Sequence, residues 1–164
     1  MNVTLTDWEF KVCEMLAAQR HHSNRQGGVN DAQIGPQDSA MTDLVGICGE
    51  FAFCKALNVY PDLTVSPRSG SYDARMGGMT VDVKTTVRES GRLLATLKKA
   101  SHMCDVYVLA VGQDLNYRLA GWVFSDELID EVNVMNLGHG LVYALDQSQL
   151  HPVSELVEAS RTFA

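Results

Sequence analysis

The sequence lacks several features that would define its class at once. No apolar run approaches the roughly 20 residues that a membrane-spanning helix needs, and the first residues have neither the basic nor the apolar region of a signal peptide. There is no internal repeat and no low-complexity segment. Because no two cysteines have Cys-x-x-Cys spacing, we expect reduced core residues and not zinc ligands at Cys13, Cys48, Cys54 and Cys104. These absences predict a soluble, intracellular, cytoplasmic protein with no membrane partner.

The chain has the size and composition of one domain. Its 164 residues, 46% of them hydrophobic, can bury a substantial core, so we expect a single domain over residues 1–164. The net charge of −7 argues against a nucleic-acid partner, but the charge is unevenly distributed. Between Arg68 and Lys99, seven basic residues outnumber three acidic ones. Phosphate contacts depend on local basic groups, so nucleic-acid binding stays open, although charge alone fits a solvated surface equally well.

The first half of the chain predicts two helices with a loop between them. A capping-box pattern begins at Thr6, and Trp8, Val12, Met15 and Leu16 then have helical spacing, which predicts a packed helix to about Gln19. Residues 20–37 are polar and contain glycine, which predicts a mobile loop. That loop is either a plain surface loop or one that orders on nucleic acid. The second helix is expected from Asp38 or Ser39 to Leu57.

The second half of the chain predicts mainly strands. The region 92–97 is ambiguous between strand and helix, and we favour a strand. A loop is expected over 133–140. The remaining expected elements are a buried strand at 105–111, a strand pairing with it at 117–124, a short helix at 126–132 capped by Ser125, a strand at 141–145 and a helix at 152–160.

The stretch from Gly70 to Thr86 is typical of a β-hairpin. Gly77-Gly78 can form a two-residue turn, and Val81 and Val83 alternate with Asp82 and Lys84, so the valines should face the core. The turn predicts the pairs Met76–Met79, Arg75–Thr80, Ala74–Val81 and Asp73–Asp82. Opposed carboxylates repel each other, and a divalent cation between them is the most economical reason for such a pair.

Glu50 is the only charged residue in the apolar run from Leu44 to Cys54. A carboxylate in a buried helix is costly unless a cation or hydrogen-bond donors meet it. The alternative is that Glu50 reaches the surface or accepts hydrogen bonds from loop amides. Gly46 and Gly49 weaken the same helix, which predicts that it approaches another backbone closely there.

A helix with Glu50, then Asp73, then Asp82-Val83-Lys84 on a strand resembles the PD-(D/E)XK nuclease superfamily, in particular its small phage-encoded members. The resemblance implies a restriction-endonuclease-like core of the α/β (α+β) class, with a central mixed β-sheet flanked by helices. Two positions depart from the common motif, since Tyr72 stands where the motif has proline and Asp82 where many members have glutamate. The second crossover helix of the superfamily has no evident counterpart between Leu93 and Cys104.

The resemblance also implies a function, a metal-dependent endonuclease that hydrolyses DNA, with recombination or replication intermediates as a substrate class. The implied catalytic residues are Glu50, Asp73, Asp82 and Lys84. The implied ligands of Mg²⁺, for which Mn²⁺ can substitute, are Asp73, Asp82, the backbone carbonyl of Val83, and Glu50. The nucleic-acid contacts expected around this site are Thr85, Arg88, Lys98, Lys99 and Arg25.

Two alternatives remain open at this level. One is a non-catalytic module that keeps the fold and binds nucleic acid or a protein, and the other is an exonuclease or RNA-directed nuclease of the same superfamily. Lys84 argues against the first, because a scaffold has no need of a lysine beside two opposed carboxylates. A homodimer and a phage or mobile-element origin are compatible with the resemblance.

Overall fold

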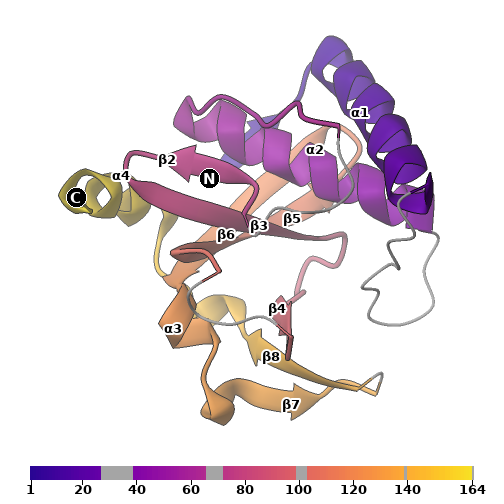
Figure 1. Cartoon of the computed structure of the whole chain (residues 1–164). Coiled ribbons are helices and arrows are strands. Elements are labelled where there is room, and N and C mark those ends of the chain that lie inside the picture. The colour runs from indigo at the N-terminus through magenta and orange to yellow at the C-terminus, as the bar shows by residue number, and fades with distance from the viewer. Residues whose placement is uncertain (27–38, 66–71, 99–102, 139, 164) are drawn as a thin grey trace.

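The computed structural model describes residues 1–26, 39–65, 72–98, 103–138 and 140–163 (Figure 1). Its main sheet has five strands in the order β1-β6-β5-β3-β2. Strands β3 and β5 are parallel, and the other neighbouring pairs are antiparallel. The predicted mixed sheet of an α+β fold is therefore confirmed. The strand bounds are β1 Asn2–Thr4, β2 Ala74–Met76, β3 Met79–Thr86, β5 Val106–Gln113 and β6 Asn116–Phe124.

A second, antiparallel sheet of three strands has the order β4-β8-β7. Its strands are β4 Leu93–Thr96, β7 Val134–Asn136 and β8 Leu141–Leu145. The helices are α1 Asp7–Gln26, α2 Ser39–Leu57, α3 Ser125–Leu128 and α4 Val153–Thr162, with 3-10 turns at Glu131–Asn133 and Gln147–Gln149. Figure 1 shows α1 and α2 on one side of the main sheet and the small second sheet on the other.

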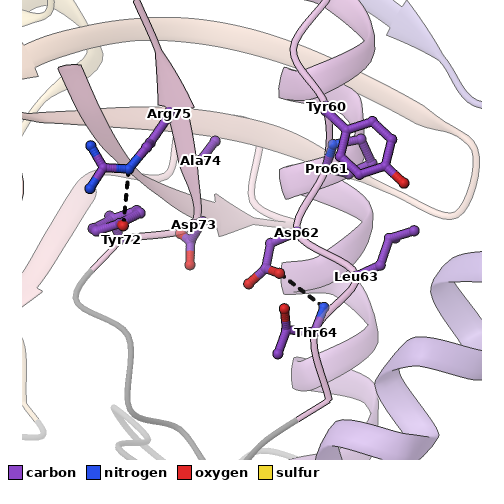
Figure 2. A pocket seen from close by; sticks show the side chains of 9 residues that line it. All are labelled: Tyr60, Pro61, Asp62, Leu63, Thr64, Tyr72, Asp73, Ala74 and Arg75. Carbon is purple, nitrogen blue, oxygen red and sulfur yellow. Dashed lines mark hydrogen bonds between the residues drawn. The ribbon is translucent and has the colours of Figure 1, made fainter. Parts of the chain in front are cut away.

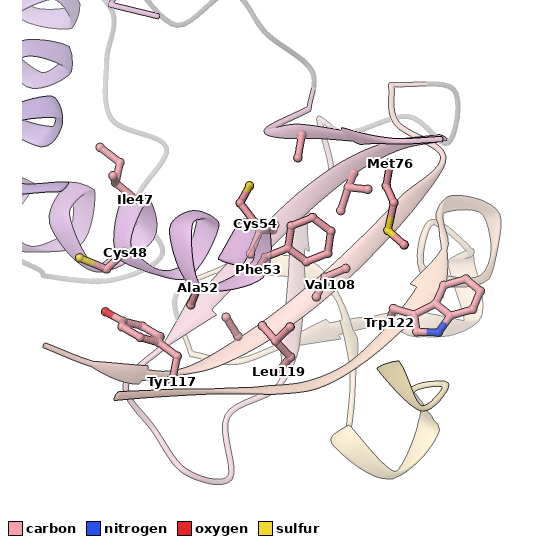
Figure 3. Close-up of a cluster of buried hydrophobic side chains, with 14 of the residues drawn as sticks. Ile47, Cys48, Ala52, Phe53, Cys54, Met76, Val108, Tyr117, Leu119 and Trp122 are labelled. Atoms are coloured by element: carbon pink, nitrogen blue, oxygen red, sulfur yellow. The ribbon is translucent and has the colours of Figure 1, made fainter. Parts of the chain in front are cut away.

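Two clusters of buried side chains hold these layers together. Between α2 and the main sheet, Phe53 packs with Val83 and Val108, in a cluster that Figure 3 shows in close-up. On the opposite face, Tyr107 and Leu109 pack with side chains of β4, β8 and α3. Alternate residues of β3 therefore point to opposite faces of the sheet. Val81 and Val83 face the cluster under α2, as the sequence predicted.

The hairpin register is confirmed for three of the four predicted pairs. Gly77-Gly78 forms the turn, with Gly77 at a φ of 61°. Met76 pairs with Met79, Arg75 with Thr80 and Ala74 with Val81. The ladder ends there, so the fourth predicted pair, Asp73 with Asp82, is not part of it.

The predicted loop over 20–37 is wrong for its first part, because α1 continues to Gln26. Polar composition favoured a loop, but side-chain contacts hold the last turns of the helix in place. Arg20 pairs with Glu50, and His21 Nδ1 lies 3.0 Å from an Asp43 carboxylate oxygen. Such tertiary contacts outweigh the weak helix propensity of the sequence. Residues 27–37 of the expected loop lie outside the described residues.

The packing face of α1 also differs from the prediction. Leu16 is buried as expected, but Trp8, Val12 and Met15 are 82%, 42% and 64% exposed. The helix packs instead through Cys13, Leu16 and Ala17. Apolar residues at helical spacing predicted the packing face, but the buried face is rotated from the predicted one and contains Cys13 and Ala17. The capping box itself is confirmed, since Thr6 N donates to Glu9 Oε2 at 2.6 Å and Glu9 N donates to Thr6 Oγ1 at 3.2 Å.

Most of the later elements agree with the sequence. The expected strands at 92–97, 105–111, 117–124 and 141–145 correspond to β4, β5, β6 and β8, and the helix at 152–160 to α4. The expected helix at 126–132 is shorter, because α3 ends at Leu128 and a 3-10 turn follows. Part of the expected loop at 133–140 is strand β7, and β1 was not predicted.

The four cysteines are free and buried, as predicted. In the part of the chain that the structure describes, no helix has both the length and the apolar character that a membrane span requires.

Candidate functional site

Asp82 and Lys84 lie on the face of β3 opposite α2, where their neighbours on β5 are Tyr107 and Leu109. Asp82 is only 2% exposed, and the Lys84 ammonium donates a hydrogen bond to its Oδ1 atom. The ammonium also lies 5.9 Å from the centre of the Tyr107 ring. Burial by itself would lower the pKa of Lys84, but the carboxylates of Asp82 and Asp73 outweigh it and the pKa is raised. Lys84 is therefore a retained positive charge at a buried carboxylate.

Asp73 lies one residue before β2, at the edge of the main sheet. Its N–H donates to the Val81 carbonyl at 2.8 Å, and its Oδ2 accepts a hydrogen bond from Val83 N at 2.7 Å. The carboxylate thus caps an N–H of β3 instead of standing opposite Asp82, which avoids the repulsion of a directly opposed pair. Since the N–H and C=O of one strand residue point to the same side, the Val83 carbonyl also faces this edge.

Glu50 lies on α2 and is 18% exposed. Arg20 meets it with a hydrogen bond of 3.1 Å from Nη1 to Oε2, so a protein cation lies at this carboxylate. The same guanidinium donates to the carbonyls of Thr64 and Asp62, at 3.1 and 2.7 Å. Burial, followed by the nearby charge of Asp73, raises the pKa of Glu50 to about 8, although Arg20 opposes the rise. Asp82 adds a smaller contribution in the same direction.

Arg20 is the site residue that sequence reasoning missed, because it was assigned to the loop. A signal for it does exist in the sequence. Cys13, Ala17 and Arg20 have the spacing of one helical face, and Cys13 and Ala17 lie in the buried stripe of α1. Continuing that stripe by one turn brings Arg20 to the same surface.

Glu50→Gln is expected to flatten the dependence of stability on pH between about 4.5 and 8. In this window the folded protein binds a proton at Glu50 that the unfolded chain releases, so wild-type stability falls as the pH rises. The loss amounts to a few kilocalories per mole, since one pKa unit corresponds to about 1.36 kcal/mol. Glutamine does not titrate, so the variant does not show this loss of stability. Urea unfolding in EDTA at pH 5 and pH 8 measures the effect.

The matched control for this prediction is Glu158→Gln, which changes an exposed glutamate of α4. Its difference from wild type should be the same at both pH values. If the free energy of unfolding of Glu50→Gln does not rise relative to that of wild type from pH 5 to pH 8, the raised pKa of Glu50 is wrong.

The carboxylates suit Mg²⁺ in chemical type, because Mg²⁺ prefers hard oxygen ligands. Their positions are less suitable. Among the described residues, no three His, Cys, Asp or Glu side chains approach closely enough to hold one ion. Each of the three acids is instead met by a protein donor, Glu50 by Arg20, Asp73 by Val83 N–H and Asp82 by Lys84. An ion shared by all three would have to replace at least the contact between Lys84 and Asp82.

Asp73 also lines an open hollow of about 540 Å³ between residues 60–64 and strand β2 (Figure 2). Tyr60 and Pro61 stand on one side of it, and Tyr72 and Arg75 on the other. The hollow gives a ligand access to the candidate site from the sheet edge. Its full lining is Tyr60, Pro61, Asp62, Leu63, Thr64, Tyr72, Asp73, Ala74 and Arg75.

The expected nucleic-acid contacts are spread over several elements. Arg25 is exposed in the last turn of α1, Arg88 is exposed after β3, and Lys98 is exposed after β4. Thr85 belongs to the face of β3 under α2, where its hydroxyl oxygen is buried and has no hydrogen-bond partner among the described residues. That hydroxyl is therefore not accessible to a phosphate in this arrangement. Lys99 lies outside the described residues.

A family model, described as a family of unknown function (DUF5843), matches residues 1–150 of the chain. The chain belongs to this family. The match to DUF5843 covers every candidate residue of the site, from Arg20 to Lys84. The chain finds no match among curated proteins or solved structures.

Proposed function

We propose that the protein is a metal-dependent nuclease that hydrolyses phosphodiester bonds of DNA. The observation that carries the proposal is the position of Asp73 beside Asp82-Val83-Lys84 of β3. The Asp73 carboxylate accepts a hydrogen bond from Val83 N–H, and the Lys84 ammonium donates to Asp82. The charges of Asp73 and Asp82 also add to the burial that raises the pKa of Glu50, and they outweigh the burial that would lower the pKa of Lys84. The order of these four residues along the chain resembles that of the PD-(D/E)XK motif.

In this proposal Asp73 and Asp82, with Glu50 and the Val83 carbonyl, would hold Mg²⁺, which when bound would polarise the phosphate and lower the pKa of a bound water. Lys84, protonated at Nζ, offsets negative charge on the phosphate oxygens. For this the ammonium must give up its hydrogen bond to Asp82 and form one to a phosphate oxygen of the substrate. Burial and the charge of Asp73 raise the pKa of Glu50 to about 8, so its carboxyl group binds a proton near neutral pH.

The substrate class expected from the resemblance, DNA intermediates of recombination or replication, is part of the proposal. Arg88 and Lys98 are exposed and available to phosphates, although they lie on different elements. The homodimer, the cytoplasmic location and the phage or mobile-element origin stay predictions.

A second candidate is a non-catalytic binding module on the same fold. The observation that favours it is that every carboxylate of the site already has a protein donor and no three of them converge. Titration calorimetry with Mg²⁺ and Mn²⁺ separates the candidates, because a module has no need of the metal. Absence of heat from either ion at this site would favour the module.

Asp73→Asn is expected to reduce DNA cleavage by about 100-fold or more, because it removes a charged oxygen ligand and leaves the side-chain shape unchanged. The assay follows conversion of supercoiled plasmid to nicked and linear forms with Mg²⁺, and EDTA should stop it. Asp126→Asn, the same change at an exposed position of α3, should cleave like wild type. Cleavage by Asp73→Asn at the wild-type rate would falsify the assignment.

A further inference from the structure

The hollow beside Asp73 has an exposed aromatic side chain on each of its two sides. Tyr60 is 80% exposed and Tyr72 is 36% exposed, and they belong to segments that face each other across the opening (Figure 2). Aromatic rings usually bury most of their surface, so two exposed rings around one opening suggest a ligand with a flat apolar face.

Arg75 holds the Tyr72 ring in place and adds positive charge beside it. The centre of the Arg75 guanidinium lies 4.8 Å from the centre of the ring, and Nε donates to the Tyr72 hydroxyl at 3.1 Å. The arginine is exposed, so it is open to a phosphate. An aromatic ring next to an exposed arginine is the combination that binds single-stranded nucleic acid, because the ring stacks on a base and the arginine meets the backbone.

Asp62 supplies a polar group of the opposite sign on the other side of the hollow. Thr64 N donates to its Oδ1 at 2.9 Å, and Arg20 Nη2 lies 3.6 Å from its Oδ2. Burial acts to raise its pKa, but the bonds from Thr64 and the charge of Arg20 prevail and the pKa is lowered. An ionised carboxylate repels phosphate and accepts hydrogen bonds from an amino group such as N4 of cytosine. This side of the hollow therefore suits the edge of a base.

We propose that the hollow binds one unpaired base of single-stranded DNA, stacked on the Tyr72 ring with its edge toward Asp62. The inference rests on the proposed nuclease, and it places the scissile phosphodiester next to this base, at Asp73. A base in a duplex is stacked between its neighbours and cannot enter the hollow without being extruded. The substrate class is therefore DNA with an unpaired segment at the cleavage site.

The test is equilibrium binding of fluorescein-labelled oligonucleotides in EDTA, in which binding is measured without cleavage. Wild type should bind a single strand more tightly than the matching duplex. Tyr72→Ala should weaken single-strand binding by about tenfold, the loss expected for one stacked base, and should leave duplex binding nearly unchanged. Tyr72→Phe keeps the ring but loses the hydrogen bond from Arg75, so it should recover most of the single-strand binding that Tyr72→Ala loses. Trp8→Ala removes an 82% exposed ring on α1, outside the hollow, and should also bind like wild type. Thermal unfolding of each variant shows that the fold is kept.

The outcomes separate this inference from the nuclease proposal. Equal losses of single-strand and duplex binding in Tyr72→Ala, or no loss in either, would overturn the base site even if the protein cleaves DNA. Selective loss of single-strand binding in a protein that never cleaves DNA would support the base site and overturn the nuclease alone. Tighter binding of oligo(dC) than of oligo(dT) is also expected, because thymine offers no amino group to Asp62. Equal affinity for the two would overturn the placement of the base edge.

Discussion

Replacing Lys84 by methionine is expected to abolish DNA cleavage and to destabilise the fold by about 3 kcal/mol. The side chain of Asp82 is 3% exposed, and the Lys84 ammonium donates directly to it. Methionine fills most of the lysine volume but leaves this buried carboxylate without its cation. The expected cost lies at the low end of the range for broken buried pairs, because the Lys84 side chain is 32% exposed and water can reach part of the pair.

A second change distinguishes the charge effect from a packing effect. Asp82→Asn combined with Lys84→Met removes both charges, and most of the lost stability should return because no uncompensated charge remains buried. Cleavage should stay lost in the double variant. Urea unfolding of wild type, both single variants and the double variant gives the coupling energy. A coupling energy near zero would show that the contact between Lys84 and Asp82 is not formed in solution.

Gly49→Ala is expected to destabilise the protein by about 1–3 kcal/mol, although alanine is the better helix former. A Cβ atom at Gly49 would lie 2.0 Å from Thr85 Oγ1 and 3.0 Å from Thr85 Cβ. Thr85 is β-branched and lies on a central strand, so it has little freedom to yield. The helix α2 must then move away from β3, and the cluster around Phe53 and Val83 loses contacts.

Gly46→Ala is the matched control, since it makes the same change in the same helix. The described residues leave nothing within 4 Å of its Cβ position, so the better helix propensity should stabilise the protein by up to about 1 kcal/mol. Thermal unfolding should move in opposite directions for the two variants. If both substitutions stabilise, the close approach of α2 to β3 at Gly49 is wrong. The sequence predicted a close approach at both glycines, and only Gly49 has one.

The hairpin could be predicted from the sequence because its determinants are local. A two-residue glycine turn sets the register, and alternation along β3 decides which side chains face the core, so three pairs and the placement of Val81 and Val83 were predicted correctly. The position of Asp73 could not be predicted in this way. Its carboxylate forms a hydrogen bond to Val83 N–H across the strand edge, a contact that no register rule contains.

The helices show the complementary limit. Glu50 was recognised as a charge that needs a partner, but the partner lies 30 residues away on α1, in a segment whose composition indicated a loop. Likewise, the apolar residues Trp8 and Met15 suggested the packing face, whereas α1 packs through Cys13 and Ala17. Both errors arise because local composition determines neither where a helix ends nor which of its faces meets a neighbour.

The contacts of Arg20 also connect two parts of the site thermodynamically. One guanidinium joins the Glu50 carboxylate to the backbone carbonyls of Asp62 and Thr64, which line the hollow. A ligand that shifts those carbonyls changes the proton affinity of Glu50. By reciprocity, protonation of Glu50 changes the affinity of the hollow for that ligand by the same factor. Proton uptake by Glu50 and ligand binding in the hollow are therefore expected to be coupled equilibria.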